Sequence, residues 1–173
     1  MIKGDLVKRA VDLYREFTLK TPVNRKIVVV YSSMYGFVDS IMNYITHALN
    51  DWGGFNVSVY KFTDKERGSI GDLIGDVNNA LGIVLGVSTY DTEPFPLMDY
   101  IIDLLIRKLR GGKPILLITD YGWGDVILKH IRTRLEKAGF TIIDSISVNG
   151  IPTKEDLNKI DVALQNFKQV IAQ

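Results

Sequence analysis

The chain has 173 residues, of which 46% are hydrophobic, so it is long enough to bury one sizeable core in a single globular domain. Its 21 Lys and Arg balance 20 Asp and Glu, and the net charge of +1 gives no signal for binding to nucleic acid or to a membrane surface. The absence of cysteine excludes disulfides, thiolate catalysis and cysteine-based metal sites. Since the sequence shows no signal-peptide pattern and no apolar run near the roughly 18–20 residues of a membrane span, we expect a soluble cytoplasmic protein.

Residues 3–19 have the spacing of an amphipathic helix, with apolar side chains near one face and Lys, Arg and Glu opposite. The stretch TPVNR then interrupts the pattern, because Thr21 precedes Pro22 and the residue before a proline disfavours helix. We therefore expect an N-terminal helix and connector over residues 1–23 and one domain over residues 24–173. The apolar face of this helix consists of Leu6, Val7, Ala10, Val11, Leu13, Tyr14 and Phe17.

Beyond the connector, five strand-like runs alternate with five helix-like runs. Alternation of this kind with short connections predicts an α/β fold, in which a parallel five-stranded sheet is doubly wound and helices cover both faces. The strand-like runs are 26–31, 55–60, 81–87, 113–119 and 140–148. The helix-like runs are about 38–51, 70–79, 96–110, 125–138 and 154–171.

The composition of the strands predicts their order in the sheet. The first, third and fourth strands are almost purely apolar, as expected of strands that helices cover on both faces. The second strand, FNVSVY, alternates apolar and polar residues, and the fifth carries Asp144 and Ser147, so we expect both strands at edges. These positions predict the strand order 2-1-3-4-5, in which ligands bind outside the carboxyl ends of the strands, where the order reverses.

The loops that leave the first, third and fourth strands should meet at that carboxyl edge. They read SSMYGFVD, STYDTEPFP and DYGWGD, and each combines aromatic residues with small or hydroxyl residues. Loop tips ordinarily favour Gly, Asn, Asp and Ser, so aromatic residues in all three loops indicate a binding site. A flat, partly apolar ligand with an anionic tail would suit these loops, because aromatic rings stack on such a ligand and N–H groups at a helix N-terminus bind phosphate.

Several other kinds of site are excluded by their missing motifs. The chain has no GxxxxGK[ST] for a Walker phosphate loop, no GxGxxG after the first strand and no GxSxG nucleophile elbow. A phosphoacceptor receiver domain needs acidic residues where Ser32, Ser33 and Ser88 stand. The two histidines, His47 and His130, fall inside predicted helices, and we expect neither a metal site nor a catalytic acid or base.

Together, SSMYG after the first strand, STY after the third and YGWG after the fourth resemble the flavodoxin-like module of flavodiiron proteins, also called A-type flavoproteins. The resemblance covers about residues 26–170, and SMYG with a downstream YGWG at the matching strand is fairly specific. It implies a flavodoxin-like fold that binds flavin mononucleotide (FMN) and transfers one or two electrons. In that family a diiron domain precedes the module through a helical connector, which residues 3–23 resemble, whereas nothing in this chain could bind the diiron centre.

The resemblance also assigns cofactor-binding residues to each of the three loops. Those of the first, phosphate-binding loop are Ser33, Met34, Tyr35, Gly36, Phe37 and Val38. Those of the second loop, on one side of the flavin ring, are Ser88, Thr89, Tyr90, Asp91 and Thr92. Those of the third loop, on the other side of the ring, are Asp120, Tyr121, Gly122, Trp123 and Gly124.

Three residues depart from the pattern of the family. Val38 replaces a threonine expected to bond the phosphate, and Phe37 replaces a small polar residue. One lost hydrogen bond to a charged phosphate costs roughly 1.5–3 kcal/mol, or about tenfold to more than a hundredfold in affinity. Asp120 replaces a serine, and another anion near the ring or the phosphate would disfavour FMN and lower its reduction potential.

Two functions remain open on the sequence. The first is an electron-transfer flavoprotein module, rather than a complete enzyme, that binds FMN and shuttles electrons between a reductase and a redox partner such as a diiron domain. The second is a flavodoxin-like domain that has lost FMN and serves as a protein-interaction or oligomerisation module. The retained STY and YGWG favour the first, and Phe37, Val38 and Asp120 favour the second. Neither involves nucleic acid or a membrane, and either could form a homo-oligomer.

Overall fold

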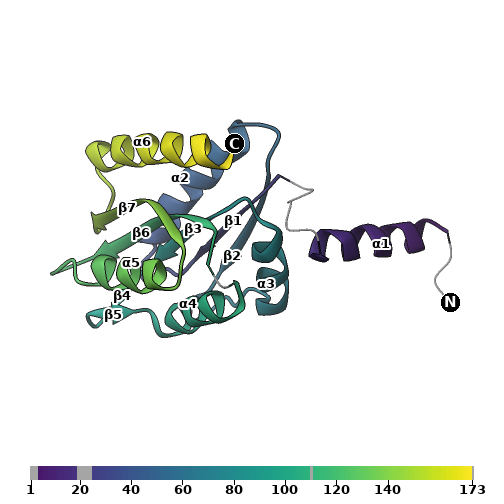
Figure 1. Ribbon diagram of the computed structural model, residues 1–173. Helices are drawn as coiled ribbons and strands as arrows, with labels where there is room; N and C mark the ends of the chain where they lie inside the picture. The colour runs from purple at the N-terminus through teal and green to yellow at the C-terminus, as the bar shows by residue number, and fades with distance from the viewer. Residues whose placement is uncertain (1–3, 19–24, 110, 173) are drawn as a thin grey trace.

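The structure, a computed structural model, describes residues 4–18, 25–109 and 111–172. Five parallel strands form its main sheet in the order β2-β1-β3-β6-β7 (Figure 1), so the predicted order of the five strands is confirmed. The strands are β1 (Lys26–Tyr31), β2 (Asn56–Lys61), β3 (Gly82–Val87), β6 (Pro114–Tyr121) and β7 (Thr141–Asn149).

The three central strands owe their position to continuous apolar runs. Val29 of β1 pairs with Val84 of β3, which in turn pairs with Leu116 of β6, and all three side chains are fully buried. Burial of one such side chain stabilises the fold by about 1.5–3 kcal/mol. A strand with apolar residues at successive positions gains this on both faces, and it is therefore most stable between two layers of helices.

The two edge strands are those that the sequence predicted. The side chains of β2 are all exposed or half-buried, and most of β7 is only half-buried. The register between β6 and β7 shifts after the pair Ile115–Ile142, because Leu116 pairs with Asp144 and leaves Ile143 without an opposing residue. A bulge of this kind twists an edge strand and makes it a poorer template for a further strand.

Helices cover both faces of the sheet (Figure 1). On one face, α2 (Phe37–Asp51) and α6 (Lys154–Ile171) bury their apolar side chains in one cluster. On the other face, α3 (Ile70–Asn79), α4 (Pro96–Leu109) and α5 (Ile127–Lys137) bury theirs in a second cluster. The helix predictions are confirmed to within two residues at each end, which is the ordinary uncertainty of helix boundaries.

Local capping explains where two of these helices begin. The Thr153 hydroxyl accepts the backbone N–H of Asp156, and the Asp156 carboxylate accepts the backbone N–H of Thr153, so a capping box starts α6. The Ser69 hydroxyl accepts the backbone N–H of Asp72 at the start of α3. Helix α2 begins differently, after Gly36 in the left-handed conformation and without a side-chain cap from that residue. That start lies in the candidate site.

Helix α1 (Asp5–Thr18) lies apart from the two helical layers, on the side of α3 (Figure 1). The predicted helix is confirmed over the described residues, whereas residues 3 and 19, the connector up to residue 23, residue 24 and the side chains of Leu13 and Phe17 lie outside them. The apolar side chains that are described on this helix are exposed. They are Leu6, Val7, Ala10, Val11 and Tyr14.

One element was not predicted from the sequence. Strands β4 (Thr89–Tyr90) and β5 (Glu93–Pro94) form a small antiparallel hairpin within the loop that follows β3. Within the described part of the chain, no helix combines the length and the apolar character needed to cross a membrane.

Candidate functional site

The carboxyl ends of the three central strands bring the three aromatic loops to one edge of the sheet. Tyr31, the last residue of β1, pairs with Gly86 of β3, and Gly86 pairs with Ile118 of β6. The chain leaves these strands through the loops at 32–36, 88–95 and 122–126 (Figure 1). The predicted site residues therefore come together at the edge where this kind of fold places its ligands.

The first loop turns directly into α2. Gly36, with φ of +88°, precedes the first helical residue, Phe37, and a side chain added at Gly36 would meet no neighbouring atom within 4 Å. The Ser33 hydroxyl accepts the backbone N–H of Asp39 at 3.2 Å. The amides of Phe37 and Val38 come earlier in the first turn, where the helix itself supplies no acceptor. This loop can therefore present two amides and the Ser33 hydroxyl proton to an anion.

Some side chains of this loop are exposed to solvent, and others are buried in the core. Tyr35 is 77% exposed, and its ring centroid lies 6.4 Å from that of Phe37, which is half-buried. Met34 is also half-buried. Val38 is fully buried and packs over Gly86, where an added Cβ would lie 3.0 Å from its Cγ1 atom. Val38 therefore contributes its side chain to the core and leaves only its backbone to the loop.

The carboxylate of Asp39 is neutralised within the structure. It accepts the Tyr31 hydroxyl at 2.7 Å and lies 3.0 Å from the Lys61 ammonium. Burial would raise the pKa of Asp39, but hydrogen bonds from Tyr31 and Lys61 outweigh it and lower the pKa. The hydrogen bond to Asp39 raises the pKa of Lys61. Lys61 was not among the residues predicted from the sequence, although it ends β2 opposite Tyr31 and could have been found from the predicted pairing of those strands.

The second loop forms the β4–β5 hairpin. Tyr90 is 47% exposed, and its ring meets that of Phe95 edge-on, with centroids 6.4 Å apart. Asp91 and Thr92 form the tip, and their φ angles of +50° and +68° are the two positive values among the described residues other than glycine. Backbone in this region is strained for residues with a Cβ, above all for β-branched threonine.

Asp120 ties the second loop to the third. Its side chain is only 6% exposed, and its carboxylate accepts the Thr89 amide at 2.9 Å and the Ser88 hydroxyl at 3.3 Å. The Thr89 hydroxyl donates in return to the Asp120 carbonyl. Burial raises the pKa of Asp120, while the bonds from Thr89 and Ser88 act in the opposite direction. The Ser88 amide donates to the Ser32 hydroxyl at 3.2 Å, so hydrogen bonds connect all three loops.

The third loop presents its tryptophan to solvent. The Trp123 side chain is fully exposed, and Gly122 and Gly124 on either side are exposed as well. Tyr121 is half-buried at the end of β6, where its carbonyl accepts the Gly150 amide at 3.2 Å. The Trp123 ring is therefore available to a ligand without disruption of any packing in the described residues.

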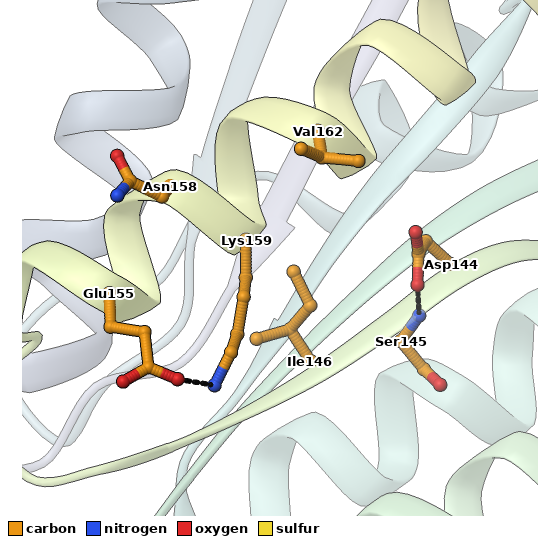
Figure 2. A pocket seen from close by; sticks show the side chains of 7 residues that line it. All are labelled: Asp144, Ser145, Ile146, Glu155, Asn158, Lys159 and Val162. Carbon is orange, nitrogen blue, oxygen red and sulfur yellow. Dashed lines mark hydrogen bonds and ion pairs between the residues drawn. The ribbon is translucent and has the colours of Figure 1, made fainter.

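Two surface hollows lie away from this edge. One, of about 460 Å³, lies between β7 and α6, where Ile146 and Val162 face each other near the ion pair that Glu155 forms with Lys159 at 2.8 Å (Figure 2). The other lies along α5 beside Lys129 and Arg134. Neither was predicted from the sequence. The described residues contain no group of three or more His, Asp or Glu side chains placed to hold a metal ion.

The chain is similar to parts of larger proteins in sequence and in fold. No family model matches the chain. A nitric oxide reductase from Moorella thermoacetica is 27% identical over 139 residues, which are 78% of this chain and 33% of that protein. A flavo di-iron protein from Thermotoga maritima superposes with a TM-score of 0.78 at 30% identity, covering 95% of this chain and 40% of the other.

A flavodoxin from the domain Archaea matches at nearly its full length. The superposition covers 84% of this chain and 98% of that flavodoxin, with a TM-score of 0.66 and 22% identity, which shows a shared fold. This chain thus spans about a third of the reductase and 40% of the flavo di-iron protein, but almost all of a flavodoxin. The chain is a flavodoxin-like domain similar to that of flavodiiron proteins, as its three loop motifs predicted.

Proposed function

We propose that the chain is an FMN-binding electron-transfer module, which works between a reductase and a redox partner. The observation that carries the proposal is the arrangement of the carboxyl edge. The amides at the start of α2, for which the helix itself supplies no acceptor, follow the loop after β1, and the exposed aromatic rings of Tyr90 and Trp123 lie in the two loops that follow β3 and β6. An anionic tail and a flat ring are the two parts of FMN that such an edge would recognise.

The residues present fit the cofactor by their chemistry. The amides of Phe37 and Val38 and the hydroxyl of Ser33 would hold the phosphate, because the Ser33 oxygen accepts from Asp39 and its proton remains available. Tyr90 and Trp123 would cover the two faces of the ring. When bound, the flavin supplies the electron-transfer chemistry, while the protein binds, orients and shields it.

The residues that depart from the family pattern should weaken FMN binding less than the sequence alone suggests. The loss of a threonine hydroxyl at Val38 is real, since valine offers no donor and its side chain is buried. The carboxylate of Asp39 forms an ion pair with Lys61. The carboxylate of Asp120 accepts hydrogen bonds from Ser88 and Thr89. Carboxylates that are paired in this way repel a bound phosphate less than free carboxylates, because the donors or the cation offset their negative charge.

The first test is the visible absorption spectrum of the purified chain, recorded before and after incubation with excess FMN and desalting. Flavin bands that survive desalting would support the proposal. Riboflavin, which lacks the phosphate, is the matched ligand, and it should bind at least tenfold more weakly if the start of α2 holds the phosphate. A chain that stays colourless and does not quench FMN fluorescence would contradict the proposal.

A protein-interaction module is the second candidate, and one observation favours it. Helix α1 exposes apolar side chains that include Leu6, Val7 and Val11. If this surface is an interface, light scattering should show a mass above 19.5 kDa, and the double substitution of Leu6→Lys with Val11→Lys should restore the monomer mass. A monomeric wild-type chain at high concentration would argue against self-association through α1.

A further inference from the structure

The carboxylate of Asp120 is the only acidic side chain among the predicted site residues that is buried in the described structure. The hydrogen bonds around it are directed to two consecutive residues of the neighbouring loop. Thr89 and Ser88 donate to the carboxylate, and Thr89 donates a second time, through its hydroxyl, to the Asp120 carbonyl. A carboxylate offers about four acceptor positions and forms stronger bonds than a serine hydroxyl would.

These bonds hold the base of a strained hairpin. Thr89 opens β4 and pairs with Pro94 of β5, while Tyr90 pairs with Glu93. The tip between them consists of Asp91 and Thr92, both with positive φ. Residues in such conformations persist only where surrounding contacts determine them, because each costs of order 1–3 kcal/mol. The hairpin is short, so the contacts at its base must supply this support.

Tyr90 lies between the held base and the strained tip. Its backbone follows Thr89 directly, and its ring rests edge-on against Phe95, whose amide donates to the Ser88 carbonyl at 2.9 Å. The direction of the Tyr90 ring therefore depends on where Ser88 and Thr89 are placed. Both residues are hydrogen-bonded to Asp120, which lies on β6, the strand beside β3.

We propose that Asp120 is a positioning residue, which clamps the base of the β4–β5 hairpin and so directs Tyr90 toward the flavin ring. The proposal rests on the proposed FMN-binding function for its second half, whereas the clamp itself concerns the chain alone. It replaces the interpretation of Asp120 as an anion that weakens the site. Under that interpretation removal of the charge strengthens FMN binding, and under the clamp removal of the acceptor weakens it.

The first experiment tests the clamp without flavin. Amide hydrogen exchange would be followed by NMR in the wild-type chain and in the variants Asp120→Ala and Asp120→Asn. Exchange at Thr89 and Tyr90 should accelerate roughly ten- to a hundredfold in Asp120→Ala, since the amide loses a charged acceptor. Asp120→Asn keeps a carbonyl oxygen of the same shape and should restore most of the protection, even if the alanine variant folds poorly.

The matched control is Asp125→Ala, which removes an exposed carboxylate from the same loop region and should leave exchange at Thr89 unchanged. Unchanged exchange at Thr89 in Asp120→Ala would overturn the clamp. Acceleration throughout the sheet in both Asp120 variants would also overturn it, because that result shows a general loss of stability rather than a local release.

The second experiment is a double-mutant cycle on FMN affinity with Asp120→Ala and Tyr90→Ala. If Asp120 acts through Tyr90, each single change should weaken binding, and Asp120→Ala should have less than a twofold effect in the Tyr90→Ala background. Additive effects, or tighter binding in Asp120→Ala, would overturn the positioning role. If the wild-type chain binds no FMN, the proposed function and the role toward the ring both fail, and the exchange data still decide the clamp.

Discussion

The Tyr31 hydroxyl donates a hydrogen bond of 2.7 Å to the carboxylate of Asp39, and the ammonium of Lys61 lies 3.0 Å from the same oxygen. The three residues come from β1, α2 and β2, so the first turn of α2 is joined to two neighbouring strands. Burial and the bond to Asp39 raise the pKa of the Tyr31 phenol, so it stays a donor well above neutral pH. This cluster pairs the charge of Asp39 in the first turn of α2, next to the proposed phosphate loop.

Replacement of Lys61 by Met should weaken FMN binding. The change removes the cation that offsets Asp39 while it keeps most of the side-chain length, so a bound phosphate would meet an uncompensated carboxylate. We expect a two- to tenfold loss of affinity, about 0.4–1.4 kcal/mol, which should diminish as salt is added. Fluorescence titration with FMN at low and high ionic strength measures the effect. Lys65→Met, an exposed lysine in the following loop, is the control, and an equal loss in both variants would contradict the explanation.

Asp76 should make the stability of the fold depend on pH. Its carboxylate accepts Lys26 at 2.5 Å and Tyr60 at 2.9 Å. Burial would raise the pKa of Asp76, but hydrogen bonds from Lys26, Ser58 and Tyr60 outweigh it, and the pKa is lowered. A lowered pKa in the folded state stabilises the fold above the unfolded pKa of about 3.9, and this stabilisation is lost as pH falls through the folded pKa.

The difference in unfolding free energy between the wild-type chain and Asp76→Asn should therefore be constant from about pH 7 to 5 and shrink below about pH 4. Urea unfolding at pH 7, 5 and 3 measures it. Asp64→Asn, which changes an exposed aspartate, serves as the reference for general effects of charge. Parallel curves for the wild-type chain and Asp76→Asn at all three pH values would show that Asp76 is not responsible.

Gly86→Ala should destabilise the chain at the point where Val38 packs on β3. An added Cβ would lie 2.7 Å from Met42 Cε, 2.8 Å from Tyr31 Cβ and 3.0 Å from Val38 Cγ1. Overpacking of this kind costs about 1–3 kcal/mol, and the shift should be visible in thermal and urea unfolding. Gly122→Ala is the control, because a Cβ there meets no atom within 4 Å and should change stability by less than about 0.5 kcal/mol. Equal stability of the two variants would show that β3 can move away from α2.

Trp123→Ala should weaken FMN binding without changing the stability of the fold. The side chain is fully exposed, so its loss should leave the unfolding free energy within about 0.5 kcal/mol of wild type. FMN affinity should fall by roughly two- to tenfold, since stacked aromatic pairs contribute about 0.5–1.5 kcal/mol beyond burial of their area. Tyr100→Ala removes an exposed ring from α4 and should leave affinity unchanged. Unchanged affinity in Trp123→Ala would exclude this ring from the site.

The sheet and its order could be predicted because their signals are local. Apolar runs such as those of β1 and β3 need two covered faces, and the alternation in β2 places that strand at an edge. The meeting of the three loops could also be predicted, since parallel strands bring their carboxyl ends to one edge of the sheet. These inferences need only the pattern of each segment and the rule that connects successive segments.

Only the tertiary structure decided which side chains meet. Val38 turned out to pack on Gly86, Asp39 to pair with Lys61, and Asp120 to hold Thr89. The last of these pairs joins residues 31 positions apart in the chain. Such contacts depend on strand register and on the rotation of each helix over the sheet, which no local pattern specifies. The sequence by itself therefore determined the fold and the edge at which a ligand would bind, whereas the charge, the burial and the clamping of that edge are set by register and packing between distant segments.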